Sequence, residues 1–215
     1  MSQSAEGHSS SASAARDPRR SVAIVGIGCR FAGAADVTSF WKLMVEGRDA
    51  FGPVPTDRWN HAAVYDPNPR AADKTYTDRG AFIDDIRSFP AVALQVPPRR
   101  VEVMDPQQRL TLECALDAIA DAGVAPGDLP RRTGVYVGVT ATEYRTLMSA
   151  RTMAQLMAAG DFGRPGDPET LAAGVERVIQ PRPFTAAGAL ANMTAAIVAQ
   201  ELQLTGPAYT VDSAC

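Results

Sequence analysis

The sequence predicts a layered α/β fold, because runs typical of buried strands alternate with stretches that carry helix signals. Short apolar blocks ended by glycine are typical of strands in a sheet covered on both faces. Between them stand helix-start signals, such as an N-cap residue followed by proline. The chain has 215 residues, 46% of them hydrophobic, and we find no internal repeat. This length suffices for one sizeable hydrophobic core.

The first 20 residues differ in composition from the rest of the chain. They are rich in Ser, Ala and Gly and end in basic residues, so they cannot bury enough apolar surface to become ordered. We therefore expect a disordered leader over 1–20 and a domain over 21–215. The leader contains no hydrophobic signal sequence, and Glu6 and Asp17 argue against a mitochondrial presequence. The expected location is cytoplasmic.

The domain is expected to begin with a strand over Val22–Gly26 that is buried on both faces. A helix around Ser39–Val45 follows, with Asp36 as one of its candidate N-caps and a glycine beyond its end. Residues 52–70 are dense in Pro, Asp and Asn, which predicts a long surface connection. The segment Gly80–Ile86 is expected to form another short apolar element.

The clearest helix signal follows Asp105. Asp105 is a good N-cap, Pro106 suits the first helical position, and Gln108 stands where a capping box places its glutamine. The helix is expected to run to Ala122 and to stop at Gly123. Its apolar residues cover most of its circumference, so most of the helix is expected to be buried. A polar stripe at i, i+4 spacing is formed by Arg109, Glu113, Asp117 and Asp121.

The rest of the chain continues the alternation of strands and helices. Its last strand points directly at Cys215, the final residue of the sequence. The expected elements are a central strand over Gly134–Thr140, a helix near 143–158, a Gly/Pro/Asp-rich stretch over 160–168, an alanine-rich helix over Thr185–Leu204 with Gly188 inside it, and a strand over Ala208–Val211.

Charge and composition exclude several classes of function. The formal net charge of −3 provides no basic field for nucleic acid or an anionic membrane. No apolar run approaches the roughly 18 residues that a membrane span needs. The chain has three cysteines at wide spacing and two histidines, His8 and His61, with no CxxC pair and no Cys/His cluster. A disulfide scaffold and a metal site are therefore not expected.

Two further motifs have structural interpretations. Gly26-Ile27-Gly28 follows the first strand, but Gly33 lies too far along for a dinucleotide-binding fingerprint, so we expect a structural glycine turn and no bound cofactor. Asp84-Asp85 has no histidine nearby and is expected at a solvated loop end rather than at a metal.

The three cysteines are not equivalent. Cys29 and Cys114 lie among apolar residues and are expected to be small buried core thiols. Cys215 follows a strand and the small residues Ser213 and Ala214, the position of a nucleophile on a strand-to-helix elbow. A thiol at a helix N-terminus is stabilised as thiolate, so Cys215 is the candidate catalytic residue.

Together these motifs resemble the β-ketoacyl synthases (ketosynthases) of fatty-acid and polyketide assembly, and the early motifs are most similar to those of modular type I polyketide synthases. The resemblance covers residues 22–215 in continuous order. The segments that carry it are Val22–Phe31, Phe40-Trp41, Pro55–Trp59, Gly80–Gly123 with its Met104–Arg109 core, Gly134–Gly138, Asn192-Met193, Gly206-Pro207 and Val211–Cys215.

This resemblance implies a thiolase-like fold of αβαβα layers, of which the chain is the N-terminal half, and usually a homodimer. It implies that Cys215 takes an acyl chain from the phosphopantetheine arm of an acyl carrier protein. Two histidines of the family then assist decarboxylation of a malonyl-type extender, and the resulting carbanion attacks the thioester. The family's histidines follow the nucleophile, so we expect residues 1–215 alone to be inactive, with the missing half covering part of their surface.

Two alternatives share the fold. A non-catalytic ketosynthase-like partner or scaffold replaces the cysteine, so the presence of Cys215 favours the enzyme. A thiolase-fold condensing enzyme acting on coenzyme A esters is the other alternative. The Met104–Arg109 segment and the Pro55–Trp59 loop favour carrier-protein partners over it.

Overall fold

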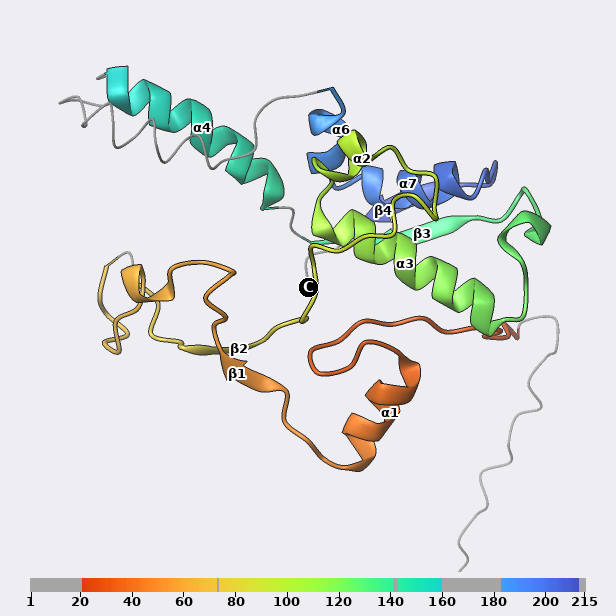
Figure 1. The fold of residues 1–215 in the computed structure, drawn as a ribbon, viewed down its shortest axis with the longest axis horizontal. Coiled ribbons are helices and arrows are strands. Elements are labelled where there is room, and N and C mark those ends of the chain that lie inside the picture. Colours follow the sequence, from red (N-terminus) through yellow and green to blue (C-terminus); the bar gives the residue numbers. More distant parts are fainter. Residues whose placement is uncertain (1–20, 73, 141–142, 160–182, 213–215) are drawn as a thin grey trace, which may run out of the picture.

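A computed structural model of the chain describes residues 21–72, 74–140, 143–159 and 183–212 (Figure 1). Helices and strands alternate along these residues, which confirms the predicted α/β class. The elements are α1 (Val37–Val45), β1 (Phe51–Pro53), the 3-10 helix η2 (His61–Ala63), β2 (Arg79–Ala81), α2 (Pro98–Val101), α3 (Pro106–Asp121), the 3-10 helix η3 (Pro126–Asp128), β3 (Val135–Gly138), α4 (Tyr144–Ala159), α6 (Thr185–Ala189), α7 (Met193–Glu201) and β4 (Ala208–Val211).

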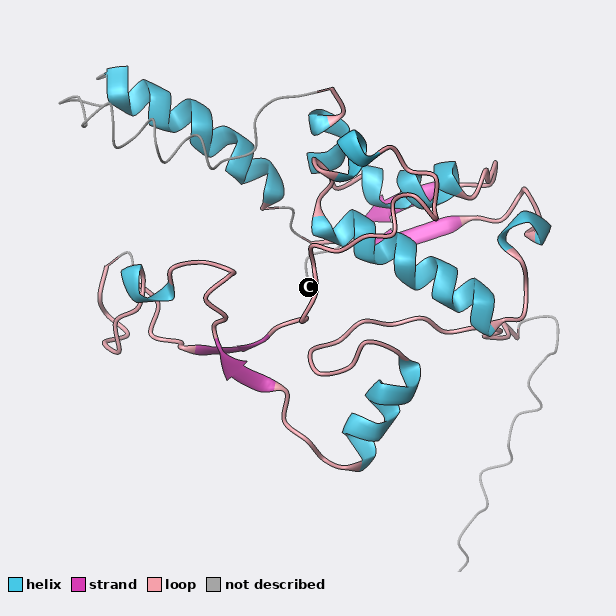
Figure 2. Ribbon diagram, in the orientation of Figure 1, coloured by secondary structure: helices cyan, strands magenta, loops and turns pink. Residues whose placement is uncertain are grey.

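The main body is built on the parallel pair β3 and β4. Val135 lies opposite Ala208, and Gly138 lies opposite Val211. Helix α7 packs against both strands and against α3, which lies alongside them (Figures 1 and 2). The core between these elements consists of Val96, Met104, Leu112, Ile197 and Val198.

A second, smaller strand pair lies apart from the first. β1 and β2 are antiparallel, with Gly52 opposite Gly80, and the long connection between them runs over the surface (Figure 2). The connection over 52–70 is therefore largely as predicted, although the sequence did not predict β1. Helix α4 projects away from the main body (Figure 1). No helix among the described residues is long and apolar enough to cross a membrane.

Several elements begin and end close to their predicted bounds. α1 is capped by Asp36, whose carboxylate accepts a hydrogen bond from Ser39 N in a capping box. Gly47, just beyond α1, has a φ of +60°, a backbone conformation that favours glycine. α3 begins after Asp105, as predicted, and α4 and β4 also lie where they were expected.

The segment Val22–Gly26 is not the buried strand that its apolar residues predicted. It pairs with no described strand, and Val22, Ile24 and Val25 are 93%, 82% and 75% exposed. A strand buried on both faces needs neighbours in a sheet, and β3 pairs only with β4 among the described strands. For the same reason β3 lies at an edge of its sheet rather than at its centre.

The helix predicted over Thr185–Leu204 is two helices. Leu190 is extended, with φ −96° and ψ 128°, and separates α6 from α7. The alanine-rich composition contains no signal for this break, because the interactions that stabilise it come from residues near 105. Two smaller expectations were also wrong. Only Gly80 and Ala81 of the segment Gly80–Ile86 lie in a strand, and only Gln108 and Leu112 of α3 are fully buried.

Candidate active site

The strand β4 leads directly toward the predicted nucleophile. It ends at Val211, and Cys215 lies four residues further on, outside the described residues. Strand β4 is parallel to β3, so the carboxyl ends of both strands lie at the same edge of the sheet. This edge is where α/β proteins place their functional groups.

Thr210 connects the end of β4 to the start of α7. Its side-chain oxygen accepts a hydrogen bond from Ala195 N at 3.4 Å and donates one to Asn192 O, also at 3.4 Å. Asn192 is the N-cap residue of α7. The position of β4 next to the α6–α7 connection therefore depends in part on one hydroxyl group.

Residues at the start of α3 form hydrogen bonds with the end of α6, on the other side of the α6–α7 connection. The backbone N–H of Asp105 donates to Gly188 O at 2.7 Å. The side-chain amide of Gln108 donates to Ala187 O at 3.0 Å and to Leu190 O at 3.1 Å. These carbonyls lie at the carboxyl end of α6, where a helix has no partners of its own for them.

Gln108 therefore does not have the capping-box role that its spacing predicted. It is 1% exposed, and Asp105 alone caps α3, through Gln107 N. The sequence contained one signal for this arrangement. Gln108 stands one turn before Leu112, on the inward face of the helix, where a polar side chain must find partners.

Burial also affects the ionisable groups at this turn. The pKa of the Asp105 carboxyl is raised, because burial disfavours its charged form; the Gln107 N–H and Arg109 oppose the shift. One oxygen of Asp105 has no hydrogen-bond partner. The pKa of the Tyr144 hydroxyl is raised for the same reason, with Arg109 opposing the shift and Asp105 adding to it.

The polar stripe of α3 contacts the N-terminal segment. Asp117 forms an ion pair with Arg30 at 2.5 Å, and Asp121 accepts a hydrogen bond from Ile27 N at 2.9 Å. Between them, Gly28 lies directly against the helix backbone. Gly26 and Gly28 are therefore structural, as predicted, but their role is close packing of an extended segment rather than a turn.

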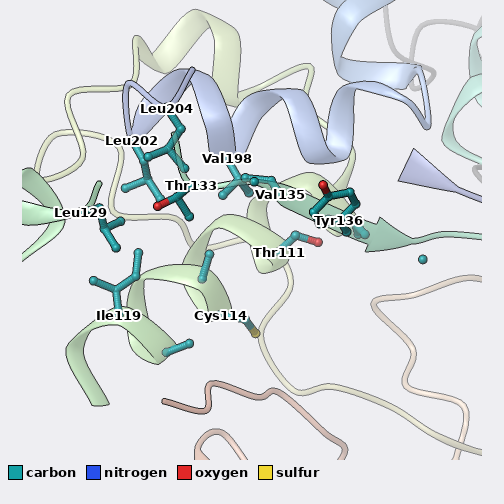
Figure 3. Close-up of a pocket in the computed structure, with 15 residues that line it drawn as sticks. Thr111, Cys114, Ile119, Leu129, Thr133, Val135, Tyr136, Val198, Leu202 and Leu204 are labelled. Atoms are coloured by element: carbon teal, nitrogen blue, oxygen red, sulfur yellow. The ribbon is translucent and has the colours of Figure 1, made fainter. Parts of the chain in front are cut away.

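An apolar groove lies between α3, β3 and α7 (Figure 3). Its volume is about 520 Å³, and its walls include Ile119, Val135, Val198 and Leu202. Cys114 lies on the α3 side of the groove (Figure 3). This cysteine and Cys29 are half-buried free thiols rather than fully buried core residues.

The remaining candidate residues are surface or packing residues. Asp85 accepts hydrogen bonds from Ser88 and from the backbone of Arg87, which lower its pKa to about 2, so it closes a solvated turn as predicted. Asp84 lies next to it on the same exposed loop. His61 packs with Trp59, whose indole N–H donates to its Nδ1 at 3.4 Å. Within the described ranges, no three His, Cys, Asp or Glu side chains are placed to hold a metal ion.

Comparison with solved structures shows the class of fold to which this arrangement belongs. An oxazolomycin ketosynthase domain from Streptomyces albus superimposes with a TM-score of 0.67 and 29% identity, covering 88% of this chain and 28% of that one. A ketosynthase from module 6 of the bacillaene synthase of Bacillus subtilis gives a TM-score of 0.64 and 28% identity over 89% of this chain and 26% of that one. The fold is that of ketosynthase domains, which is thiolase-like.

The sequence comparisons identify the family. The family described as "Beta-ketoacyl synthase, N-terminal domain" matches residues 19–215. This chain belongs to the β-ketoacyl synthase family.

Curated relatives of the chain are polyketide synthases. A phenolphthiocerol/phthiocerol polyketide synthase of Mycobacterium tuberculosis is 36% identical over 196 residues, which are 90% of this chain and 11% of that protein. A phenolphthiocerol synthesis polyketide synthase type I of Mycobacterium marinum is 38% identical over 197 residues, 90% of this chain and 8% of that protein. The chain thus spans about a tenth of the length of these two relatives.

Proposed function

We propose that this chain is the N-terminal part of a β-ketoacyl-[acyl-carrier-protein] synthase of polyketide biosynthesis, with Cys215 as its nucleophile. The observation that carries the proposal is the family match, which extends through residue 215 at the end of the segment led by β4. The relatives named above are polyketide synthases and ketosynthase domains, and they give no support to a scaffold or to a coenzyme A-dependent condensing enzyme.

In the first step the Cys215 thiolate attacks the carbonyl carbon of an acyl thioester on the phosphopantetheine arm of an acyl carrier protein. The new bond to the Cys215 sulfur forms as the bond to the phosphopantetheine sulfur breaks. The released thiolate takes up the proton that Cys215 gave up. Backbone N–H groups stabilise the negative charge on the carbonyl oxygen in such reactions.

In the second step a malonyl-type thioester loses carbon dioxide and becomes an enolate. The enolate carbon attacks the Cys215 thioester, and the bond to the Cys215 sulfur breaks, giving a β-ketoacyl thioester and free enzyme. The enolate needs imidazole donors. His8 lies outside the described residues, and His61 is engaged with Trp59 far along the chain from Cys215.

We therefore propose that residues 1–215 alone do not condense acyl chains. Exposed apolar residues support this proposal. Tyr136, Tyr209 and Val211 are exposed on β3 and β4, as is the segment Val22–Val25. Exposed apolar residues in such numbers are typical of regions that another part of a protein covers. We propose that the complete synthase acts as a cytoplasmic homodimer that binds no cofactor of its own beyond the carrier-bound substrate.

The test is acyl transfer from an acyl-loaded carrier protein to the intact polypeptide that carries this sequence. Mass spectrometry of peptides locates the acyl group, and we expect it on Cys215. Cys215→Ala removes the modification, whereas Cys29→Ala, which replaces a half-buried thiol, retains it. An acyl group on Cys29 or Cys114, or none on the parent, contradicts the proposal. β-Ketoacyl product from residues 1–215 alone contradicts the proposal that they are inactive.

A further inference from the structure

We propose that Gln108 is a positioning residue for acyl transfer: it fixes the α6–α7 connection and, through it, the carboxyl end of β4 that leads to Cys215. The proposal rests on the proposed function of Cys215. It goes beyond that function by assigning a role to a buried amide that lies more than 100 residues before the nucleophile in the sequence.

The amide of Gln108 holds the last turn of α6 and the first residue of the α6–α7 connection. A side-chain amide group has two hydrogens to donate. The Nε2 atom lies 3.0 Å from Ala187 O and 3.1 Å from Leu190 O, so both have acceptors. The side chain is almost completely buried, and water cannot take its place. Loss of the amide would leave the carbonyls of Ala187 in α6 and of Leu190 in the connection without this donor.

The same connection is held by β4. Asn192 lies two residues after Leu190, and its carbonyl accepts the hydrogen bond from Thr210 Oγ1. The N–H of Ala195, one turn further along, donates to that hydroxyl oxygen. Gln108 in α3 and Thr210 in β4 therefore fix one three-residue connection between them. Thr210 precedes the last residue of β4 and stands five residues before Cys215.

A displacement of the connection would therefore act on Thr210, five residues before Cys215 in the sequence. Neighbouring packing limits other movements, since Gly188 lies directly against Val103, and Thr194 is fully buried. A misplacement of about 1 Å at a nucleophile lowers a rate up to roughly 100-fold. A smaller displacement, transmitted from Gln108, should therefore lower the rate without unfolding the protein.

The experiment replaces Gln108 by methionine, which keeps the unbranched shape and removes both donors. Acylation of Cys215 is followed in single turnovers of the intact polypeptide with an acyl-loaded carrier protein. For Gln108→Met we expect the rate constant, per molecule able to react, to fall roughly tenfold. Thr210→Val should lower it similarly, and Thr210→Ser should restore it. The double variant Gln108→Met/Thr210→Val should be no slower than the slower single variant, because both act through one connection.

The matched control is Gln155→Met, the same substitution at an exposed position of α4, which should leave the rate constant unchanged. A merely structural role for Gln108 would lower the fraction of reactive molecules but not their rate constant. A Gln108→Met rate constant within about twofold of the parent, or additive effects of the two substitutions, overturns the proposal.

A second readout separates this proposal from the proposed function. The rate of Cys215 alkylation by iodoacetamide, measured by peptide mass spectrometry, does not depend on acyl transfer. If the parent is not acylated at Cys215, the proposed function fails, and the alkylation rates alone test the positioning role of Gln108. Slower alkylation in both Gln108→Met and Thr210→Val then supports positioning by Gln108. Equal alkylation rates in these variants and the parent overturn it.

Discussion

Gly28 lies so close to α3 that a Cβ atom at this position would stand 2.2 Å from the carbonyl oxygen of Cys114. No rotamer change relieves such a contact, since the obstacle is backbone. The N-terminal segment runs along the helix at this point and is held on either side by Asp117 and Asp121.

Gly28→Ala should therefore destabilise the protein by about 1–3 kcal/mol, the usual cost of forcing extra atoms into a packed contact. The control is Gly127→Ala, where a Cβ would meet nothing within 4 Å. Urea unfolding of the intact polypeptide gives both values. An equal free energy of unfolding for the two variants would show that the segment does not pack on α3 as described.

The Arg30–Asp117 ion pair should contribute a measurable coupling energy. The two side chains are 23% and 46% exposed, so water screens the pair only in part. A double-mutant cycle with Arg30→Ala and Asp117→Ala should give about 0.5–1 kcal/mol at low salt and less at high salt. The more exposed Arg48–Glu46 pair is the matched control and should give a smaller coupling. Equal coupling in the two pairs would contradict a specific role for Arg30.

The sequence predicted local structure well where the signals are local. Asp105 and Pro106 mark the start of α3 by capping chemistry, and the alternating valines of β3 mark a strand by their spacing. Sequence-based prediction failed where the local structure depends on a partner far along the chain. The break at Leu190 depends on hydrogen bonds from Gln108 and Asp105, which no pattern within 185–204 reveals.

The candidate site shows the same contrast between local and distant signals. Strand β4, which precedes Cys215, follows from a short motif. The hydrogen bonds of the Thr210 hydroxyl and the Gln108 amide were not predicted, because their partners are backbone groups next to the break between α6 and α7. The apolar Val22–Val25 run predicted a buried strand, yet burial depends on which surfaces are present to cover it.

Asp105 should make stability depend on pH. Its pKa is raised in the folded protein, so the folded state holds a proton that the unfolded state, with a carboxyl pKa near 3.8, has released. The contribution of Asp105 to stability therefore falls as the pH rises from about 3.8 through its raised pKa in the folded state, and it stays constant at higher pH. Asp105→Asn keeps a capping oxygen and removes the titration. Its free energy of unfolding, relative to the parent, should increase between about pH 4 and pH 7.

The control for this experiment is Asp36→Asn, at the N-cap of α1. The Asp36 pKa is lowered, mainly by hydrogen bonds from Ser39. The ionised carboxyl therefore stabilises the folded state at pH values above its pKa in the unfolded state, and this stabilisation is lost as the pH falls. The difference in the free energy of unfolding between Asp36→Asn and the parent should therefore change only below about pH 4. If the difference in the free energy of unfolding between Asp105→Asn and the parent does not change from about pH 4 to pH 7, Asp105 is not buried as described.

Arg58 should be the most important side chain of the long connection between β1 and β2. Its guanidinium donates to the carbonyls of Ile83 and Asp84, and its side chain is only 12% exposed. Removal leaves the part-buried carbonyl of Ile83 without this donor, so Arg58→Ala should cost about 1–3 kcal/mol. Arg58→Lys keeps one charged donor and should cost less.

Arg87→Ala is the control for this prediction. Arg87 also donates to a backbone carbonyl, that of Asp57, but its side chain is 69% exposed, so the substitution should cost under about 1 kcal/mol. Urea unfolding orders the three variants. Equal losses for Arg58→Ala and Arg87→Ala would show that the buried contacts of Arg58 do not stabilise this connection.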